Sequence, residues 1–248
     1  MKEQLQKDFD NTVKNLNLSQ KDIEIKKFSL DNFLNKGFPN RKEEDWKFSD
    51  LNQIIKKNIG ELSFYNDYTY TNKVDTSEFV DGLEHNKIVF INGRIEKIDF
   101  DYEKKEQIEI IDQSETINKF DNNNSLSDLN NALTNKSFKI VIKKGYQLVK
   151  PLIIYHTSNS KIWSKNINLR LDFELEEDSS LRLIDLFNDT SEKNFFNIFY
   201  DFNLKENAIL KNYKVDKQEN KNIKYSFNNI EQNKNTISET FILSSGSN

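Results

Sequence analysis

The chain has 248 residues, 35% hydrophobic and 12% aromatic, which is enough to bury a core beneath a highly charged surface. Its 36 basic and 40 acidic residues leave a net charge of −4 and no global field for a polyanion, and its lack of cysteine excludes disulfides and thiolate sites. No apolar run approaches the roughly eighteen residues of a membrane span. We therefore expect a soluble, cytoplasmic protein that binds neither nucleic acid nor membrane.

The N-terminal part is predicted to be helical. From Lys2 to about Ile59, apolar residues recur at spacings of three and four, as in amphipathic helices. The segment 37–39 contains glycine and proline and breaks the pattern. Asn40 is then a candidate N-cap, with Glu43 placed to complete a capping box. The expected third helix has one apolar face made of Phe48, Leu51 and Ile55.

Turn signals dominate the middle of the chain. Residues 60–86 form a mixed junction, after which two apolar runs flank Asn92-Gly93, the typical turn of a tight β-hairpin over 88–95. Residues 112–127 form a polar linker. A short helix is expected over 126–133, capped by Ser125 or Ser127.

After Phe138 the apolar period changes to two, which indicates strands. Alternation runs through 169–175, with Arg170, Asp172 and Glu174 on the face opposite the leucines, and it continues through 196–204 and 223–227. No helical segment of about ten residues separates these strands, which disfavours the βαβ architecture of nucleotide-binding enzymes.

An internal repeat crosses the strand region. Segments 142–148, 175–181 and 204–210 share the order apolar, two polar, then Gly145, Asp178 or Asn207, two more residues, and apolar. The marked positions are 33 and 29 residues apart, and their residue types accept left-handed backbone angles. The pattern favours stacked coils, as in a parallel β-helix. A β-sandwich, with these residues as ordinary turns, is the alternative.

The last residues resemble the same corner. Leu243–Gly246 match its first four positions, so we expect the chain to stop within a coil. A solenoid without a terminal cap exposes an unpaired edge.

Motifs for catalysis are absent from the sequence. The six glycines are too far apart for a dinucleotide fingerprint or a P-loop. His85 and His156 lack metal-ligand spacing. We expect His156 to be a hydrogen-bonded histidine at a strand end, with a ligand or acid–base role as the alternative.

Two acidic runs are candidate carboxylate pairs for glycoside hydrolysis. Residues 43–45 lie in an expected first helical turn and 176–178 at an expected corner, where solvated charge is usual. Trp46 and Trp163 are candidate aromatic platforms, although Trp46 is expected in the core. We therefore predict no catalytic residue, no metal ligand and no defined cofactor-binding residue.

The chain resembles a known family over most of residues 28–248. Its segment 37–51 reads GFPNRKEEDWKFSDL and is similar to the signature G-x-P-x-R-K-x-E-x-W-K-[YF]-[ST]-x-L of the SufD branch of the SufB/SufD family. Segments 89–94, 129–133 and 151–156, followed by the strand that contains Arg170, are similar to that family in the same order. The absence of cysteine also favours SufD over SufB.

The resemblance implies a non-catalytic scaffold of the SUF iron–sulfur cluster assembly system. It implies a helical N-terminal domain, a right-handed parallel β-helix and a C-terminal helical segment. A SufB-like paralogue and a SufC-like ATPase are the implied partners, with a homodimer as an alternative assembly. The iron–sulfur cluster and reduced flavin belong to the complex and not to this chain alone. The family's SufC-docking segment and interface histidine lie beyond residue 248, so no residue here inherits those roles.

We divide the chain into a helical domain with its junction, residues 1–86, and a hairpin with an incomplete β-helix, residues 87–248. Because many β-helices act on polysaccharides, a polysaccharide-acting or polysaccharide-binding β-helix is the alternative function, with Glu176 and Glu177 as its candidates.

Overall fold

The computed structural model describes residues 2–16, 18–64, 80–113, 124–134, 137–157, 162–188, 193–218 and 222–246. Its helices are α1 (Lys2–Lys14), α2 (Gln20–Lys36), α3 (Leu51–Asn58) and α4 (Ser125–Leu133), with short 3₁₀ turns at Glu44–Trp46 and Lys105–Gln107. Its strands are β1 (Asn86–Ile91), β2 (Arg94–Asp99), β3 (Ile108–Asp112), β4 (Ser137–Ile142), β5 (Leu152–Thr157), β6 (Asn166–Leu175), β7 (Ser180–Asn188), β8 (Phe195–Leu204), β9 (Ile209–Gln218), β10 (Ile223–Gln232) and β11 (Ile237–Gly246).

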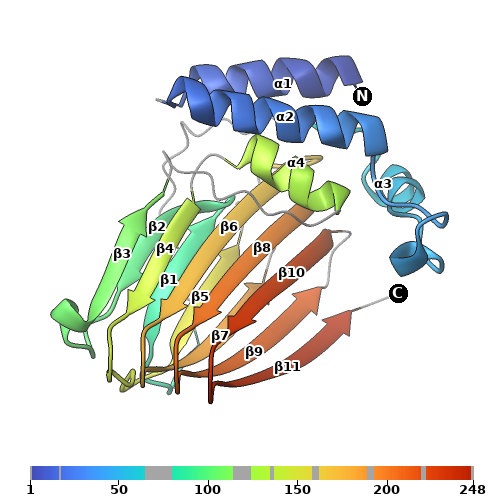
Figure 1. Ribbon diagram of the computed structural model, residues 1–248. Coiled ribbons are helices and arrows are strands. Elements are labelled where there is room, and N and C mark those ends of the chain that lie inside the picture. Colours follow the sequence, from blue (N-terminus) through green and yellow to red (C-terminus); the bar gives the residue numbers. More distant parts are fainter. Residues whose placement is uncertain are drawn as a thin grey trace.

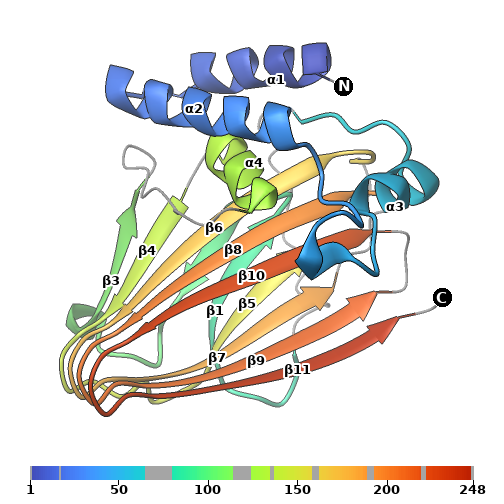
Figure 2. The same cartoon turned by 45° about the vertical axis from the view of Figure 1, so that its right-hand side comes forward.

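The strands form two facing sheets of a parallel β-solenoid (Figure 1), which confirms the predicted fold class. One sheet has the order β11-β9-β7-β5-β1-β2 and the other β10-β8-β6-β4-β3. Neighbouring strands from successive coils are parallel, and only the outermost strands β2 and β3 are antiparallel to their neighbours. Helices α1, α2 and α4 lie over the sheet that contains β6 and β8 (Figures 1 and 2).

The solenoid turns at left-handed residues, as the repeat predicts. Gly145, Asp178 and Asn207 have φ of 71°, 58° and 60°, and a fourth corner at Asn235 has φ 57°. The Asn235 corner escapes the sequence pattern because Gln232 and Ser238 replace its flanking apolar residues. The predicted corner at 243–246 is wrong, since these residues continue β11.

The Asn92-Gly93 hairpin is confirmed between β1 and β2, with both turn residues at positive φ. Gly93 is also needed for space. A Cβ at this position would lie 2.6 Å from Cγ2 of Ile167, so the turn packs directly on the start of β6.

Alternating residues of β4 to β8 fill the interior of the solenoid, including Leu169, Leu171 and Phe173 of β6. In the first half of β10, over 223–227, the alternation has the opposite phase. The register aligns Lys224 and Ser226 with the inward Phe196 and Ile198 of β8, so polar residues point inward. The apolar residues of β10 (Ile223, Tyr225 and Phe227) pack instead against the helical layer.

A second core joins the helices to the outer face of the solenoid. It contains Leu5, Leu30 and Leu129 from three helices, together with Phe195 and Phe199 of β8. The face of β6 opposite its leucines is buried here, as Arg170 and Asp172 are 5% and 6% exposed. The predicted alternation is confirmed, and Arg170 on its polar face donates to Oδ1 of Asn131 in α4 at 3.2 Å.

Two helix starts differ from prediction. Asn40 and Glu43 do interact, because the Asn40 N–H donates to Oε1 of Glu43 at 3.2 Å, but only a turn and a 3₁₀ segment follow. The helix α3 starts at Leu51, capped by the Asp50 carboxylate, and Phe48 is 86% exposed and not on its buried face.

The N-cap of α4 is Asn124 and not Ser125 or Ser127. The Asn124 side chain accepts a hydrogen bond from the Leu126 N–H at 2.9 Å, which satisfies a donor of the first turn. The sequence did not distinguish the three positions, because asparagine and serine are both favourable N-cap residues.

A buried lysine closes the other end of α4. Nζ of Lys26, from α2, donates to the carbonyl oxygens of Asn131 at 3.1 Å and Thr134 at 2.6 Å. Burial lowers the pKa of Lys26 to about 7, although the charge of Asp22 acts in the opposite direction. A neutral amine retains two N–H groups, which match these two carbonyls.

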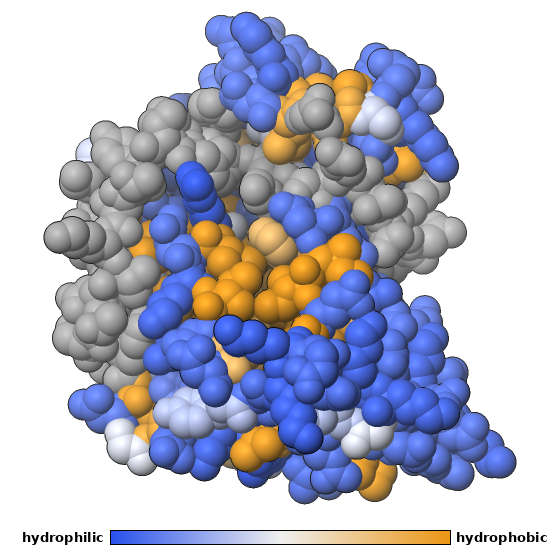
Figure 3. Space-filling model, turned by 90° about the vertical axis from the view of Figure 1, so that its left-hand side faces the viewer, coloured by the Kyte–Doolittle hydropathy of each residue, from blue (hydrophilic) through white to orange (hydrophobic). Residues whose placement is uncertain are grey.

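The solenoid core reaches the surface on the side of β2 and β3. Hydrophobic residues gather in the middle of this face, bordered by hydrophilic ones (Figure 3). Partly buried residues of the core in this region include Ile95 and Ile108.

Candidate functional site

A cluster of ionisable side chains lies inside the solenoid. His156, at the end of β5, is 4% exposed and stacks on Phe90 with 5.4 Å between ring centroids. Its Nε2 lies 2.8 Å from Oη of Tyr200 and 3.0 Å from Oδ1 of Asp185. The prediction of a hydrogen-bonded histidine at a strand end is confirmed.

Two lysines of the next coil complete this cluster. Nζ of Lys214 lies 3.7 Å and Nζ of Lys224 lies 3.8 Å from Oδ2 of Asp185. Lys224 also pairs with Asp216 at 2.5 Å, and Lys214 donates to Ser226 at 2.5 Å. Two carboxylates thus face two ammonium groups in the interior, which allows charges to balance away from water.

Burial and neighbouring charge shift the acidities in this cluster. Burial opposes ionisation of Asp185, but Lys224, His156 and Lys214 outweigh it and hold the Asp185 pKa well below its usual range. Burial lowers the pKa of Lys214 to about 8, although the negative charge of Asp185 acts to raise it. Burial and the Asp185 charge raise the pKa of Tyr200 well above 10.

A small cavity adjoins the interior cluster. The cavity beside His156, lined also by Phe90, Gly93 and Ile198, has a volume of about 10 Å³, close to that of one water molecule. A molecule larger than water does not fit in this cavity. The cluster pairs charged side chains of neighbouring coils.

The solenoid presents two strand edges at the end that contains β10 and β11. Each of these strands has one hydrogen-bonded neighbour among the described residues, β8 for β10 and β9 for β11. Apolar side chains are exposed on β11, where Phe241, Ile242 and Leu243 are 58%, 61% and 53% exposed. Unpaired backbone groups beside exposed apolar side chains are suited to strand addition.

Next to the β10 edge lies a hollow of about 630 Å³, here called the aromatic–acidic hollow, lined by Glu43, Glu44, Asp45, Trp46, Asn124, Tyr225 and Phe227. Trp46 is only half-buried and its ring centroid lies 5.9 Å from that of Tyr225. The expectation of a core Trp46 is therefore wrong, since this tryptophan forms part of a surface hollow.

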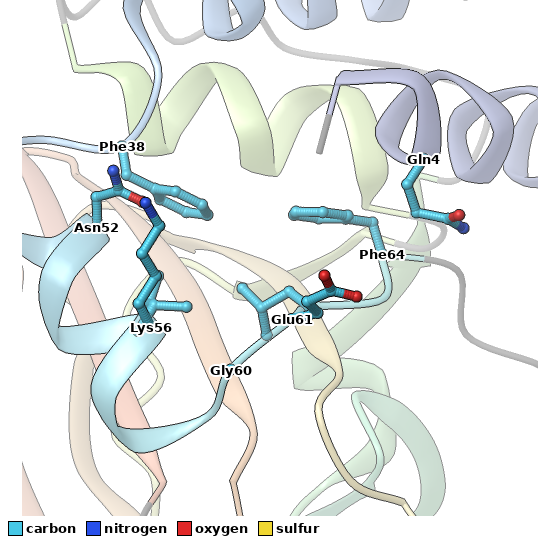
Figure 4. Close-up of a pocket in the computed structure, with 9 residues that line it drawn as sticks. Gln4, Phe38, Asn52, Lys56, Gly60, Glu61 and Phe64 are labelled. Carbon is cyan, nitrogen blue, oxygen red and sulfur yellow. The ribbon is translucent and has the colours of Figure 1, made fainter.

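A separate cavity of about 500 Å³ lies between α1, α3 and the segment 60–64. Phe38 and Phe64 point toward each other across it, with Lys56 and Glu61 on its other sides (Figure 4). The N–H of Phe64 donates to Oδ2 of Asp8 at 2.8 Å, which fixes this side of the cavity.

The other candidate residues lie apart from these features. His85 lies 2.9 Å from the Tyr155 hydroxyl and is 6% exposed. Glu176 and Glu177, at the solenoid corner, pair with Lys143 and Lys144 respectively. Trp163 is 75% exposed.

Sequence reasoning missed the interior cluster because its residues come from five strands. The one available signal was the set of isolated lysines and Asp185 at inward positions of alternating strands. Within the described ranges, no group of three or more histidine, cysteine, aspartate or glutamate residues is placed to hold a metal ion.

None of the described helices has the length and apolar character needed to cross a membrane. No family model matches the sequence, and no curated protein is significantly similar to it.

Proposed function

We propose that this chain is a scaffold subunit of a SUF-type iron–sulfur cluster assembly machinery, acting in the cytoplasm without catalytic residues of its own. It pairs with a cysteine-bearing SufB-like paralogue and with a SufC-like ATPase, and supports iron acquisition and cluster building in the complex. The GFPNRKEEDWKFSDL segment motivates this assignment.

The observation that carries the proposal is the pair of strand edges at the β10 and β11 end. Two sheet edges side by side offer backbone donors and acceptors to the sheets of a second solenoid. The exposed Phe241, Ile242 and Leu243 supply apolar area that such contact would bury. A related β-solenoid is the partner whose edges have matching geometry.

The proposal is tested by co-expressing the chain with a SufB-like protein and a SufC-like ATPase from the same genome, followed by size-exclusion chromatography. We expect the chain to elute with the paralogue. An Ile242→Lys variant should lose co-elution, because it places a charge on the exposed β11 surface.

The matched control is Ile98→Lys. Ile98 is 41% exposed and lies on β2, at the edge of the same sheet opposite to β11. This variant should co-elute like the unmodified chain. Separate elution of the unmodified chain and the paralogue would contradict the proposal.

A further inference from the structure

We propose that the aromatic–acidic hollow binds a lysine- or arginine-bearing extended segment of a partner protein, which pairs with the edge of β10 that has no hydrogen-bonded neighbour among the described residues. This inference shares the β10 edge with the proposed scaffold function, but it assigns a chemistry to the partner segment and a role to the residues around Trp46.

The floor of the hollow is aromatic and held in place. The Tyr225 hydroxyl accepts a hydrogen bond from Nδ2 of Asn124 at 2.7 Å, and the Phe227 ring packs on Phe199 with 5.3 Å between centroids. With Trp46 beside Tyr225, three aromatic rings line the hollow, and aromatic rings attract a cation placed over their faces.

The rim supplies negative charge. Glu43, Glu44 and Asp45 line the hollow, and none of its described lining residues is a lysine or an arginine. Glu44 is paired with Lys47 at 3.0 Å on the exposed surface, whereas neither Glu43 nor Asp45 has a cationic partner among the described residues. Charge complementarity therefore requires a cationic occupant and disfavours a phosphate-bearing one.

The β10 edge explains why the occupant is an extended segment. Tyr225 and Phe227 are outward residues at the edge of their sheet, and the segment before α3 lies over the start of β10 (Figure 2). A strand added to this edge would lie about 4.8 Å from β10, with every second side chain directed outward. Those side chains would lie beside the aromatic floor and beneath the acidic rim.

The volume suits this occupant. A hollow of about 630 Å³ can accept lysine or arginine side chains together with part of their backbone. Both side chains combine an apolar stem, which packs on the rings, with a charged end group that reaches the rim.

The test uses the whole chain with a Trp163→Phe change, which leaves Trp46 as the sole tryptophan because the chain has two. The probe is the acetylated and amidated peptide TKVKTKV, and the counter-probe is TQVQTQV. Saturable change of Trp46 fluorescence is expected with the lysine peptide, and affinity at least about fivefold weaker with the glutamine peptide.

The double variant Glu43→Gln, Asp45→Asn should weaken lysine-peptide binding by about fivefold, since it removes two rim charges without removing buried groups. The control Glu176→Gln, Glu177→Gln removes two charges at the distant corner and should leave binding unchanged. Raising the salt concentration should weaken binding.

Equal affinity for the two peptides, unchanged affinity in the rim variant, or no fluorescence change at millimolar lysine peptide would each overturn the inference. These outcomes are separate from the scaffold proposal, which is decided by co-elution with the paralogue. Co-elution without selectivity for lysine would retain the scaffold role and reject a cationic segment.

Discussion

The stability of the protein depends on the protonation of Lys26, and the sign is opposite to that of a lysine in an ordinary ion pair, whose pKa is raised. Burial lowers the pKa of Lys26 from 10.5 to about 7, so the unfolded chain binds more protons than the folded chain between these values. The unfolding free energy therefore rises with pH across this window.

The magnitude follows from the two pKa values. Between pH 7 and pH 9, linkage with these values gives a gain of about 2 kcal/mol in the unfolding free energy. Replacing the lysine in Lys26→Met removes the titrating group, and this contribution disappears. The difference in stability between the unmodified chain and the variant should thus shift by about 2 kcal/mol over this interval in favour of the unmodified chain.

Urea denaturation followed by circular dichroism at pH 7, 8 and 9 measures this difference. Subtracting the unfolding free energy of the variant from that of the unmodified chain cancels the contributions of other titrating groups, including Lys214. The control Lys57→Met removes an exposed lysine of α3 and should give a difference that changes little with pH. A pH-independent difference for Lys26→Met would refute the account of a desolvated, neutral amine that caps α4.

Three further changes test the solenoid by urea denaturation. Gly93→Ala should lower the unfolding free energy by about 1–3 kcal/mol, because the new Cβ would meet Ile167. The control Gly82→Ala should cost less, because Gly82 has a similar φ of 73° but no atom within 4 Å of the new Cβ. Equal costs for the two variants would contradict this interpretation. Asn207→Val should destabilise by about 1–2 kcal/mol more than Asn207→Gly, owing to the left-handed corner, and the reverse order would contradict it. Asp185→Asn should cost about 3–5 kcal/mol by leaving buried cations unbalanced, and a change below 1 kcal/mol would show that the interior charges are hydrated.

Local signals predicted much of the fold. Asn92-Gly93 predicted the hairpin because its turn needs positive φ at both residues, and Gly145, Asp178 and Asn207 predicted corners for the same reason. The fourth corner at Asn235 has the same backbone, but its flanking residues Gln232 and Ser238 are polar. Apolar flanks were therefore too strict a criterion.

Tertiary contacts set the features that sequence patterns did not predict. The inward and outward faces of β10 cannot be told from its alternation, because the helical layer makes its outward face as apolar as an interior one. Trp46 was assigned to the core because a helix was expected directly after Asn40, whereas α3 starts only at Leu51. The cluster around Asp185 depends on the register of coils about 30 residues apart, so no local motif marks it.

We propose above all that the β10 and β11 end docks a SufB-like solenoid. Amide hydrogen exchange of the chain, measured with and without the purified paralogue, tests it most directly. Pairing at these edges predicts slower exchange over Ile223–Gln232 and Ile237–Gly246 and unchanged exchange over Arg94–Asp99 in β2. Protection confined to β2, or no protection of β10 and β11 at saturating paralogue, would contradict the account.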